Sequence, residues 1–192
     1  MKKNILELNN FQKLKNDMLS LFNQIEQKAN FGRMQRLKQW DLKGSEINLF
    51  KENFCKILAK KVSLNEWQFS AVKKITVYKD KARIVHQFCL GDFILAKFLQ
   101  KKLAPLLETF WPETLHSYRK GKSQYTAISY LFQYLKKHRK NLPKKNWGLF
   151  IYKTDISQYG LSVPTYNESQ LWTLIKKYLP LCETEFDLVK KC

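Results

Sequence analysis

The sequence lacks any long apolar run, any paired-cysteine motif and any cluster of histidines. No stretch approaches the roughly 18 consecutive apolar residues that a membrane-spanning helix needs, so membrane insertion is set aside. The first residues, Met1 to Glu7, gain a carboxylate before an apolar stretch develops, which makes a poor signal peptide. The isolated histidines show no metal-ligand spacing, and the cysteines form no CxxC pair: His86, His116, His138, Cys55, Cys89, Cys182 and Cys192. This usage favours reduced thiols in a cytoplasmic protein over a disulfide or zinc scaffold.

Acidic residues are also scarce. The 192 residues include 16 Asp and Glu against 35 Lys and Arg, which gives a formal net charge of +19. A charge of that size repels itself in a compact state unless a polyanion offsets it. Nucleic acid is therefore the leading partner, and an anionic membrane surface is the second. With 44% hydrophobic residues, the chain can still form one good core or one and a half small lobes.

The first third of the sequence reads as helices. Apolar residues recur at spacings of three and four, which predicts two amphipathic helices separated by a basic stretch. The first stripe is Phe11, Leu14, Met18, Leu21, Phe22 and Ile25, and the second is Ile47, Phe50, Phe54, Ile57 and Leu58.

From Trp67 the pattern changes. Residues 72–78 and 83–87 alternate as two strands around Lys79, Asp80 and Lys81, which predicts a hairpin. A long helix is expected next, with Phe93, Ile94, Phe98 and Leu106 inward. Ser123 is a plausible N-cap for a helix whose stripe is Ala127, Ile128, Leu131 and Leu135. A buried strand over 148–152 and a final helix with Leu171, Leu174, Ile175 and Tyr178 complete an α+β chain.

Three segments carry candidate chemistry. In the hairpin, Lys81 and Arg83 occupy alternate strand positions, so both can point at one phosphate group. In the segment from His116 to Ser123, a glycine precedes a helix and Arg119 supplies a planar fork for phosphate oxygens. The first segment alone has an ordinary alternative, a solvated basic face, and the second is not a Walker loop.

The third segment runs from Phe150 to Gly160. Asp155 ends a strand that is predicted to be buried and apolar, where burying a carboxylate costs free energy and therefore indicates a role. Holding Mg²⁺ is such a role, because hard oxygen ligands suit that ion. The alternative is an aspartate that caps the next turn.

Taken in order, these segments resemble bacterial reverse transcriptases: group II intron maturases, retron enzymes and phage-defence reverse transcriptases. The resemblance rests on KxR at Lys81 and Arg83, SYRxGxS from Ser117 to Ser123, and an apolar strand that ends in TDIS and an aromatic residue, Thr154 to Tyr159. It extends from about Trp67 to Pro164. It implies a helix-rich fingers region with a β-hairpin and the beginning of a palm sheet. The implied segments are a basic helical extension (1–66), a fingers-like region (67–146) and an incomplete palm (147–192).

The resemblance also implies roles for individual residues. Asp155 would be the catalytic metal ligand for Mg²⁺, while Lys81 and Arg83 would contact the phosphates of a deoxynucleotide triphosphate. Arg119 would do likewise or contact the template. Backbone groups of Ile156 would lie near that triphosphate. Gly160 stands where the family usually has an aromatic side chain that blocks a ribose 2′-hydroxyl, which predicts weak sugar discrimination in the complete enzyme. Cations that would contact RNA or DNA are Arg33, Arg36, Lys38, Lys120 and Lys122.

One part of the family pattern is missing. The second palm motif, an aromatic-x-Asp-Asp turn, has no counterpart, since the sequence contains no Asp-Asp pair. Two-metal nucleotidyl transfer needs carboxylates from both places, so we expect this chain to be inactive alone and a second chain could supply the rest of the palm and thumb. The alternative is a non-catalytic RNA- or DNA-binding protein derived from the fingers. A third possibility is an unrelated basic protein.

Overall fold

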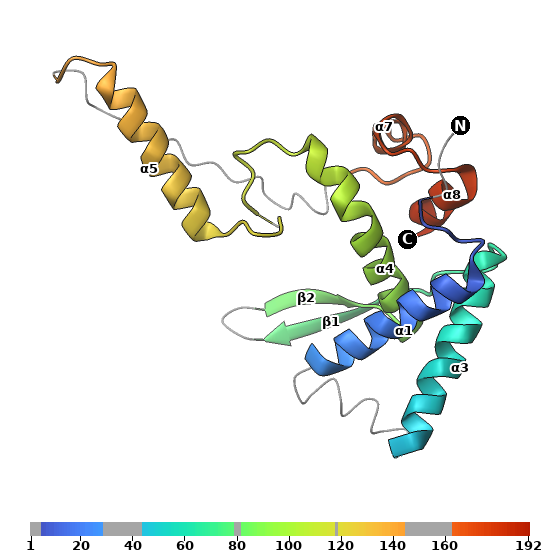
Figure 1. The fold of residues 1–192 in the computed structure, drawn as a ribbon. Coiled ribbons are helices and arrows are strands. Elements are labelled where there is room, and N and C mark those ends of the chain that lie inside the picture. The colour runs from blue at the N-terminus through green and yellow to red at the C-terminus, as the bar shows by residue number, and fades with distance from the viewer. Residues whose placement is uncertain (1–4, 29–43, 79–81, 118, 145–162) are drawn as a thin grey trace. The chain divides into compact units, whose positions relative to one another are not determined.

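Helices and one small sheet make up the computed structural model in Figure 1, which describes residues 5–28, 44–78, 82–117, 119–144 and 163–192. The elements are α1 (Phe11–Lys28), α3 (Gly44–Ser63), β1 (Lys73–Tyr78), β2 (Ala82–Gln87), α4 (Leu90–Leu107), the short 3₁₀ helix η1 (Glu108–Phe110), α5 (Gln124–Lys140), α7 (Gln170–Tyr178) and α8 (Glu183–Lys191). The helix-rich α+β expectation is therefore confirmed at this coarse level.

The chain divides into two compact units. The first unit joins residues 1–104 with 172–192, and the second contains residues 105–171. The predicted segments 1–66, 67–146 and 147–192 follow from the resemblance to reverse transcriptases, and that division stays a prediction. In the first unit the C-terminal helix α8 belongs with the N-terminal helices, which the sequence does not indicate.

The helix α1 follows the predicted stripe. Leu14, Met18, Leu21 and Phe22 are buried, and α1 packs against α3. The Asn10 side chain accepts a hydrogen bond from the backbone N–H of Lys13 at 3.1 Å, so it caps an otherwise unsatisfied donor at the first turn. Here periodicity alone located both the helix and its inner face.

The helix α3 exists as predicted, but its inner face is rotated. Cys55, Leu58, Ala59 and Val62 are buried, whereas Ile57 is 59% exposed. The buried set keeps the three-and-four spacing of a helix, which Ile57 breaks. Its predicted inward position is wrong.

Two ion pairs fasten α1 to its neighbours. Lys51 of α3, which is 5% exposed, pairs with Glu26 of α1 and lies 5.9 Å from the centre of the Phe22 ring. On the same helix Asp17 pairs with Lys102 of α4 at 2.7 Å. Removing one member of the buried pair would leave an uncompensated charge, so Lys51 and Glu26 are expected to tolerate only joint replacement.

The C-terminal helix α8 is tied to the start of the chain by a buried carboxylate. Glu185, fully buried, accepts hydrogen bonds from the backbone N–H groups of Leu6 and Cys182, the latter at 3.1 Å. The Trp172 ring meets the Phe186 ring edge-on, with centroids 6.2 Å apart. These contacts explain why residues 172–192 form one unit with the N-terminal part.

The predicted hairpin and the long helix after it are both present. β1 and β2 pair antiparallel, with Lys73 opposite Gln87 and Tyr78 opposite Ala82. In α4, Ile94 and Phe98 are buried as expected, while Phe93 and Leu106 are half-buried. Figure 1 shows the two strands side by side, joined by a short segment to the first turn of α4.

In the second unit, α5 begins where the sequence predicts. Ser123 adopts an extended conformation and its hydroxyl accepts from the backbone N–H of Thr126, while the Thr126 hydroxyl bonds back to Ser123. This reciprocal cap fixes the helix start. The helix has no buried residue, and Ile128 and Leu131 of its predicted stripe are 64% and 47% exposed.

Candidate nucleic-acid and nucleotide interface

The hairpin presents cations on both of its faces. Because side chains alternate across strands, Lys73, Ile75 and Val77 share one face with Arg83 and Val85. On the opposite face, Lys74 stands directly across from His86. All of these side chains are exposed, so Arg83 and Lys73 are accessible to a polyanion.

A hairpin of two exposed strands needs support at its base, because such a unit is marginal by itself. Asp92, in the first turn of α4, supplies it. Its carboxylate is fully buried and accepts hydrogen bonds from the Trp67 indole N–H at 3.0 Å, the Ser70 backbone N–H at 2.9 Å and the Cys89 thiol at 3.0 Å. One carboxylate thus holds the chain just before β1 and just after β2.

The neighbouring residue, Gly91, allows this arrangement. A Cβ at position 91 would lie 2.6 Å from Cη2 and 2.8 Å from Cζ2 of the Trp67 ring. The indole cannot easily withdraw, because its N–H is bonded to Asp92. Gly91 is therefore required for the close approach of Trp67 to the start of α4.

In the second unit, Arg119 is held inside the protein by a network of acceptors. Its Nε and Nη2 donate to Glu108 Oε1 at 2.8 and 2.6 Å, and its Nη1 donates to the backbone oxygens of Pro112 and Leu115 at 2.9 and 3.3 Å. The guanidinium also lies 5.9 Å from the centre of the Trp111 ring. Through these hydrogen bonds, Arg119 connects three parts of the segment that follows α4. Its predicted phosphate contact stays a prediction and would require exchange of some of these bonds.

His116 connects the segment that precedes α5 to the helix itself. Its Nδ1 lies 2.9 Å from the Thr126 hydroxyl, and its ring is 5.7 Å from the Tyr130 ring. After it, Gly121 takes a positive φ of 74°, which favours glycine, and sits between exposed Lys120 and half-buried Lys122. Residues 119–122 thus form a turn in which the Lys122 N–H donates to the Arg119 backbone oxygen at 3.3 Å, and the two lysines flank the left-handed Gly121.

Several predicted site residues lie outside the described part of the chain: Lys81, Asp155, Ile156, Gly160, Arg33, Arg36 and Lys38. Among the residues that the structure describes, no three His, Cys, Asp or Glu side chains gather as a metal site. The Mg²⁺ assignment to Asp155 therefore stays a prediction. Of the phosphate-contacting set, Arg83 and Arg119 are described, and they belong to different units.

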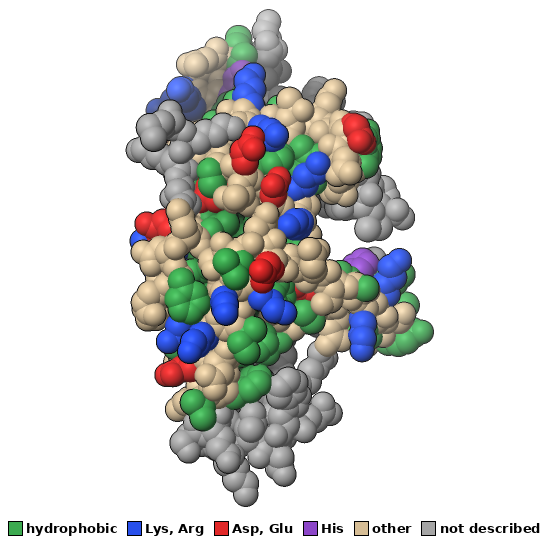
Figure 2. Space-filling view, turned by 90° about the vertical axis from the view of Figure 1, so that its right-hand side faces the viewer, with side chains coloured by type: hydrophobic (Ala, Val, Ile, Leu, Met, Phe, Trp, Pro, Cys, Tyr) green, Lys and Arg blue, Asp and Glu red, His purple; other side chains and the backbone are tan. Residues whose placement is uncertain are grey.

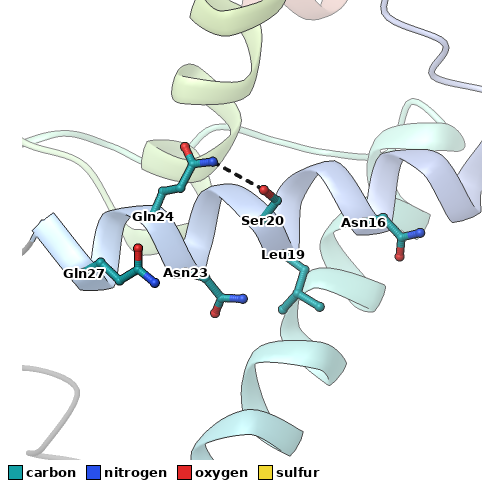
Figure 3. Close-up of a pocket in the computed structure, with 6 residues that line it drawn as sticks. All are labelled: Asn16, Leu19, Ser20, Asn23, Gln24 and Gln27. Carbon is teal, nitrogen blue, oxygen red and sulfur yellow. Dashed lines mark hydrogen bonds between the residues drawn. The ribbon is translucent and has the colours of Figure 1, made fainter.

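Two shallow surface hollows among the described residues contain none of these predicted site residues. One is lined by the polar side of α1, where Gln24 donates to the Ser20 hydroxyl at 3.4 Å (Figure 3). The other is lined by residues 7 and 9–11. The described lining of the α1 hollow consists of amide side chains, one hydroxyl and one leucine. On the face drawn in Figure 2, Lys and Arg side chains are spread among exposed hydrophobic ones.

Comparison with known proteins identified no relative of this chain. No protein-family model, no curated protein and no solved structure matches this chain. No helix among the described residues is both long and apolar enough to span a bilayer.

Proposed function

We propose that this chain is the N-terminal part of an RNA-directed DNA polymerase of the reverse-transcriptase type, and that it binds nucleic acid and the incoming deoxynucleotide triphosphate. The observation that supports it best is the hairpin. It occurs where the KxR motif predicts the phosphate-contacting fingers element, and its Arg83 is exposed. Its base is held by Asp92 in a defined position on α4.

The chemistry of the complete enzyme would use Asp155. A carboxylate oxygen is a ligand that Mg²⁺ favours, and the bound ion would neutralise charge on the triphosphate. Arg83 and Lys81 would bind phosphate oxygens as cations, and Arg83 can do so through two parallel hydrogen bonds. The proposal thus gives Asp155 the metal ion and Arg83 a phosphate group of the triphosphate.

The nucleic-acid part is tested by RNA binding at several salt concentrations. Removing one cation that neutralises a phosphate reduces the slope of log affinity against log salt by roughly 0.7 for a single strand. Replacing both Lys73 and Arg83 by Ala should therefore weaken binding and flatten the slope by about 1.4. The matched control replaces exposed Lys56 and Lys60 of α3, which removes the same charge. Equal weakening by both variants would refute a specific role for the hairpin.

The catalytic part is tested by primer extension. With no Asp-Asp pair in the sequence, this chain alone should add no nucleotide to a primer on an RNA template. Extension by the purified chain, abolished by Asp155→Asn, would show that the second carboxylate motif is not needed. Extension unaffected by Asp155→Asn would contradict the assignment of the metal ligand.

A further inference from the structure

The helix α5 carries a row of large exposed side chains. Tyr125 is 74% exposed, Ile128 64% and Phe132 68%. Their spacing of three and four places them on one side of the helix, and Lys136 continues the same line four residues further. These four residues, Tyr125, Ile128, Phe132 and Lys136, are called the α5 stripe below. It spans about 16 Å along the helix axis.

The contacts that described residues of the second unit make with α5 reach a different side of the helix. His116 contacts Thr126 through its Nδ1 and Tyr130 through its ring. At 3.6 residues per turn, Thr126 and Tyr130 lie about 100° and 140° around the axis from Tyr125. The contacts that anchor α5 therefore leave the stripe exposed.

The charge of α5 decides which partner fits. The helix contains four Lys and Arg residues in its last five positions and no Asp or Glu. Aromatic rings and cations thus follow one another along one line of the helix. Single-stranded nucleic acid has the complementary pattern, because unpaired bases stack on aromatic rings while the phosphates contact cations. Paired bases in a duplex do not expose their faces to such rings.

A membrane surface and a second copy of this chain fit the α5 stripe less well. A helix that lies in a membrane surface carries its cations on a polar face along its length, whereas those of α5 are confined to its end. Self-association through the stripe would bring together two α5 helices, and these would repel each other because their charged residues are all positive.

From this arrangement we infer that the α5 stripe binds unpaired bases of single-stranded RNA or DNA, with the lysines at its C-terminal end on the adjacent phosphates. The inference rests on the nucleic-acid part of the proposed function and adds a second binding surface, in the other unit from the hairpin. It assigns base stacking to Tyr125 and Phe132 and phosphate contact to Lys136.

The experiment replaces Tyr125 and Phe132 together by Ala in the full chain. Alanine suits a helix, so α5 should persist, and circular dichroism checks this. The probe is an unstructured 20-nucleotide RNA, measured beside a blunt duplex of the same sequence. Each stacking interaction removed should reduce affinity roughly five- to 150-fold, so at least a tenfold loss is expected for the single strand and less than threefold for the duplex. The control, Leu49→Ala with Ile57→Ala, removes two exposed apolar side chains from α3.

A direct binding-site measurement accompanies the affinities. RNA carrying 5-iodouracil should cross-link on irradiation to Tyr125 or Phe132 of the unaltered chain, as identified by mass spectrometry of the peptide. Unchanged single-strand affinity in the variant, or cross-links confined to other residues, would overturn the inference. Loss of binding to vesicles rich in phosphatidylglycerol with RNA binding kept would assign the stripe to membranes, and a dimer converted to a monomer would assign it to self-association.

The outcomes also separate this inference from the proposed function. If Lys73→Ala with Arg83→Ala weakens RNA binding while the α5 variant does not, only the stripe assignment fails. If the unaltered chain binds no RNA, both fail.

Discussion

The carboxylate of Asp92 gives the sharpest stability prediction, through the conservative change Asp92→Asn. Asn keeps one carbonyl oxygen, so the bond from the Trp67 indole can persist, but an amide nitrogen then faces the Ser70 N–H. The hydrogen bond from the Ser70 N–H to a charged acceptor is lost, which costs about 1.5–3 kcal/mol, and the weaker bond from the Cys89 thiol to the same oxygen is lost with it. Because the Ser70 residue is exposed, we expect a total loss near the middle of that range, about 2 kcal/mol.

Urea unfolding followed by circular dichroism and tryptophan fluorescence measures this loss. With a slope of about 2 kcal/mol per molar urea, the midpoint should fall by about 1 M. The matched control is Asp187→Asn on the exposed side of α8, which should stay within about 0.5 kcal/mol. Equal midpoints for the two variants would show that Asp92 does not hold the hairpin base.

Three further changes test separate parts of the structure. Burial raises the pKa of the Cys55 thiol to about 11, so the folded state keeps this proton. That stabilisation is complete below about pH 9, falls by about 1 kcal/mol between pH 9 and 10, and the fall should disappear in Cys55→Ala. An unchanged pH slope in the variant would contradict it. Gly91→Ala should cost about 1–3 kcal/mol in urea unfolding, since its methyl group would overlap the Trp67 ring, and a neutral result would mean that the indole is free to move. Arg119→Lys keeps the charge but loses the forked bonds to Glu108, so amide hydrogen exchange over residues 108–117 should accelerate about tenfold; unaltered exchange would leave the guanidinium without a structural role.

Local patterns were sufficient to predict several elements. The stripe of α1 and the cap at Ser123 are encoded within a few residues, so periodicity and capping chemistry located them. The hairpin was predicted for the same reason, because alternation and a polar turn are local features.

Long-range partners could not be read in this way. The role of Asp92 depends on the donors Trp67 and Ser70, which lie 25 and 22 residues away in the sequence. Arg119 was interpreted as a phosphate ligand from its planar fork and the nearby glycine, and no motif indicated its acceptor Glu108, eleven residues upstream. The position of a charged group is decided by interactions that the local sequence does not specify.

The exposed faces were the hardest to predict. Helical spacing identifies an apolar side of a helix but does not say whether another element covers it. For this reason Ile57 of α3, and Ile128 and Leu131 of α5, were expected to face inward although they are exposed. The helix α8 follows α7, which was expected to be the final helix. Its inner side depends on Glu185, a carboxylate buried by the backbone of Leu6 at the other end of the chain.

The central proposal is that Asp155 holds a metal ion that binds a nucleotide triphosphate, and Mn²⁺ relaxation measured by NMR tests it most directly. Mn²⁺ takes oxygen ligands as Mg²⁺ does, and it broadens the amide signals of residues close to it. With Mn²⁺ and a deoxynucleotide triphosphate present, we predict selective broadening of the Asp155 amide signal, lost in Asp155→Asn. No broadening at Asp155, or broadening at position 155 that survives Asp155→Asn, would contradict the polymerase assignment.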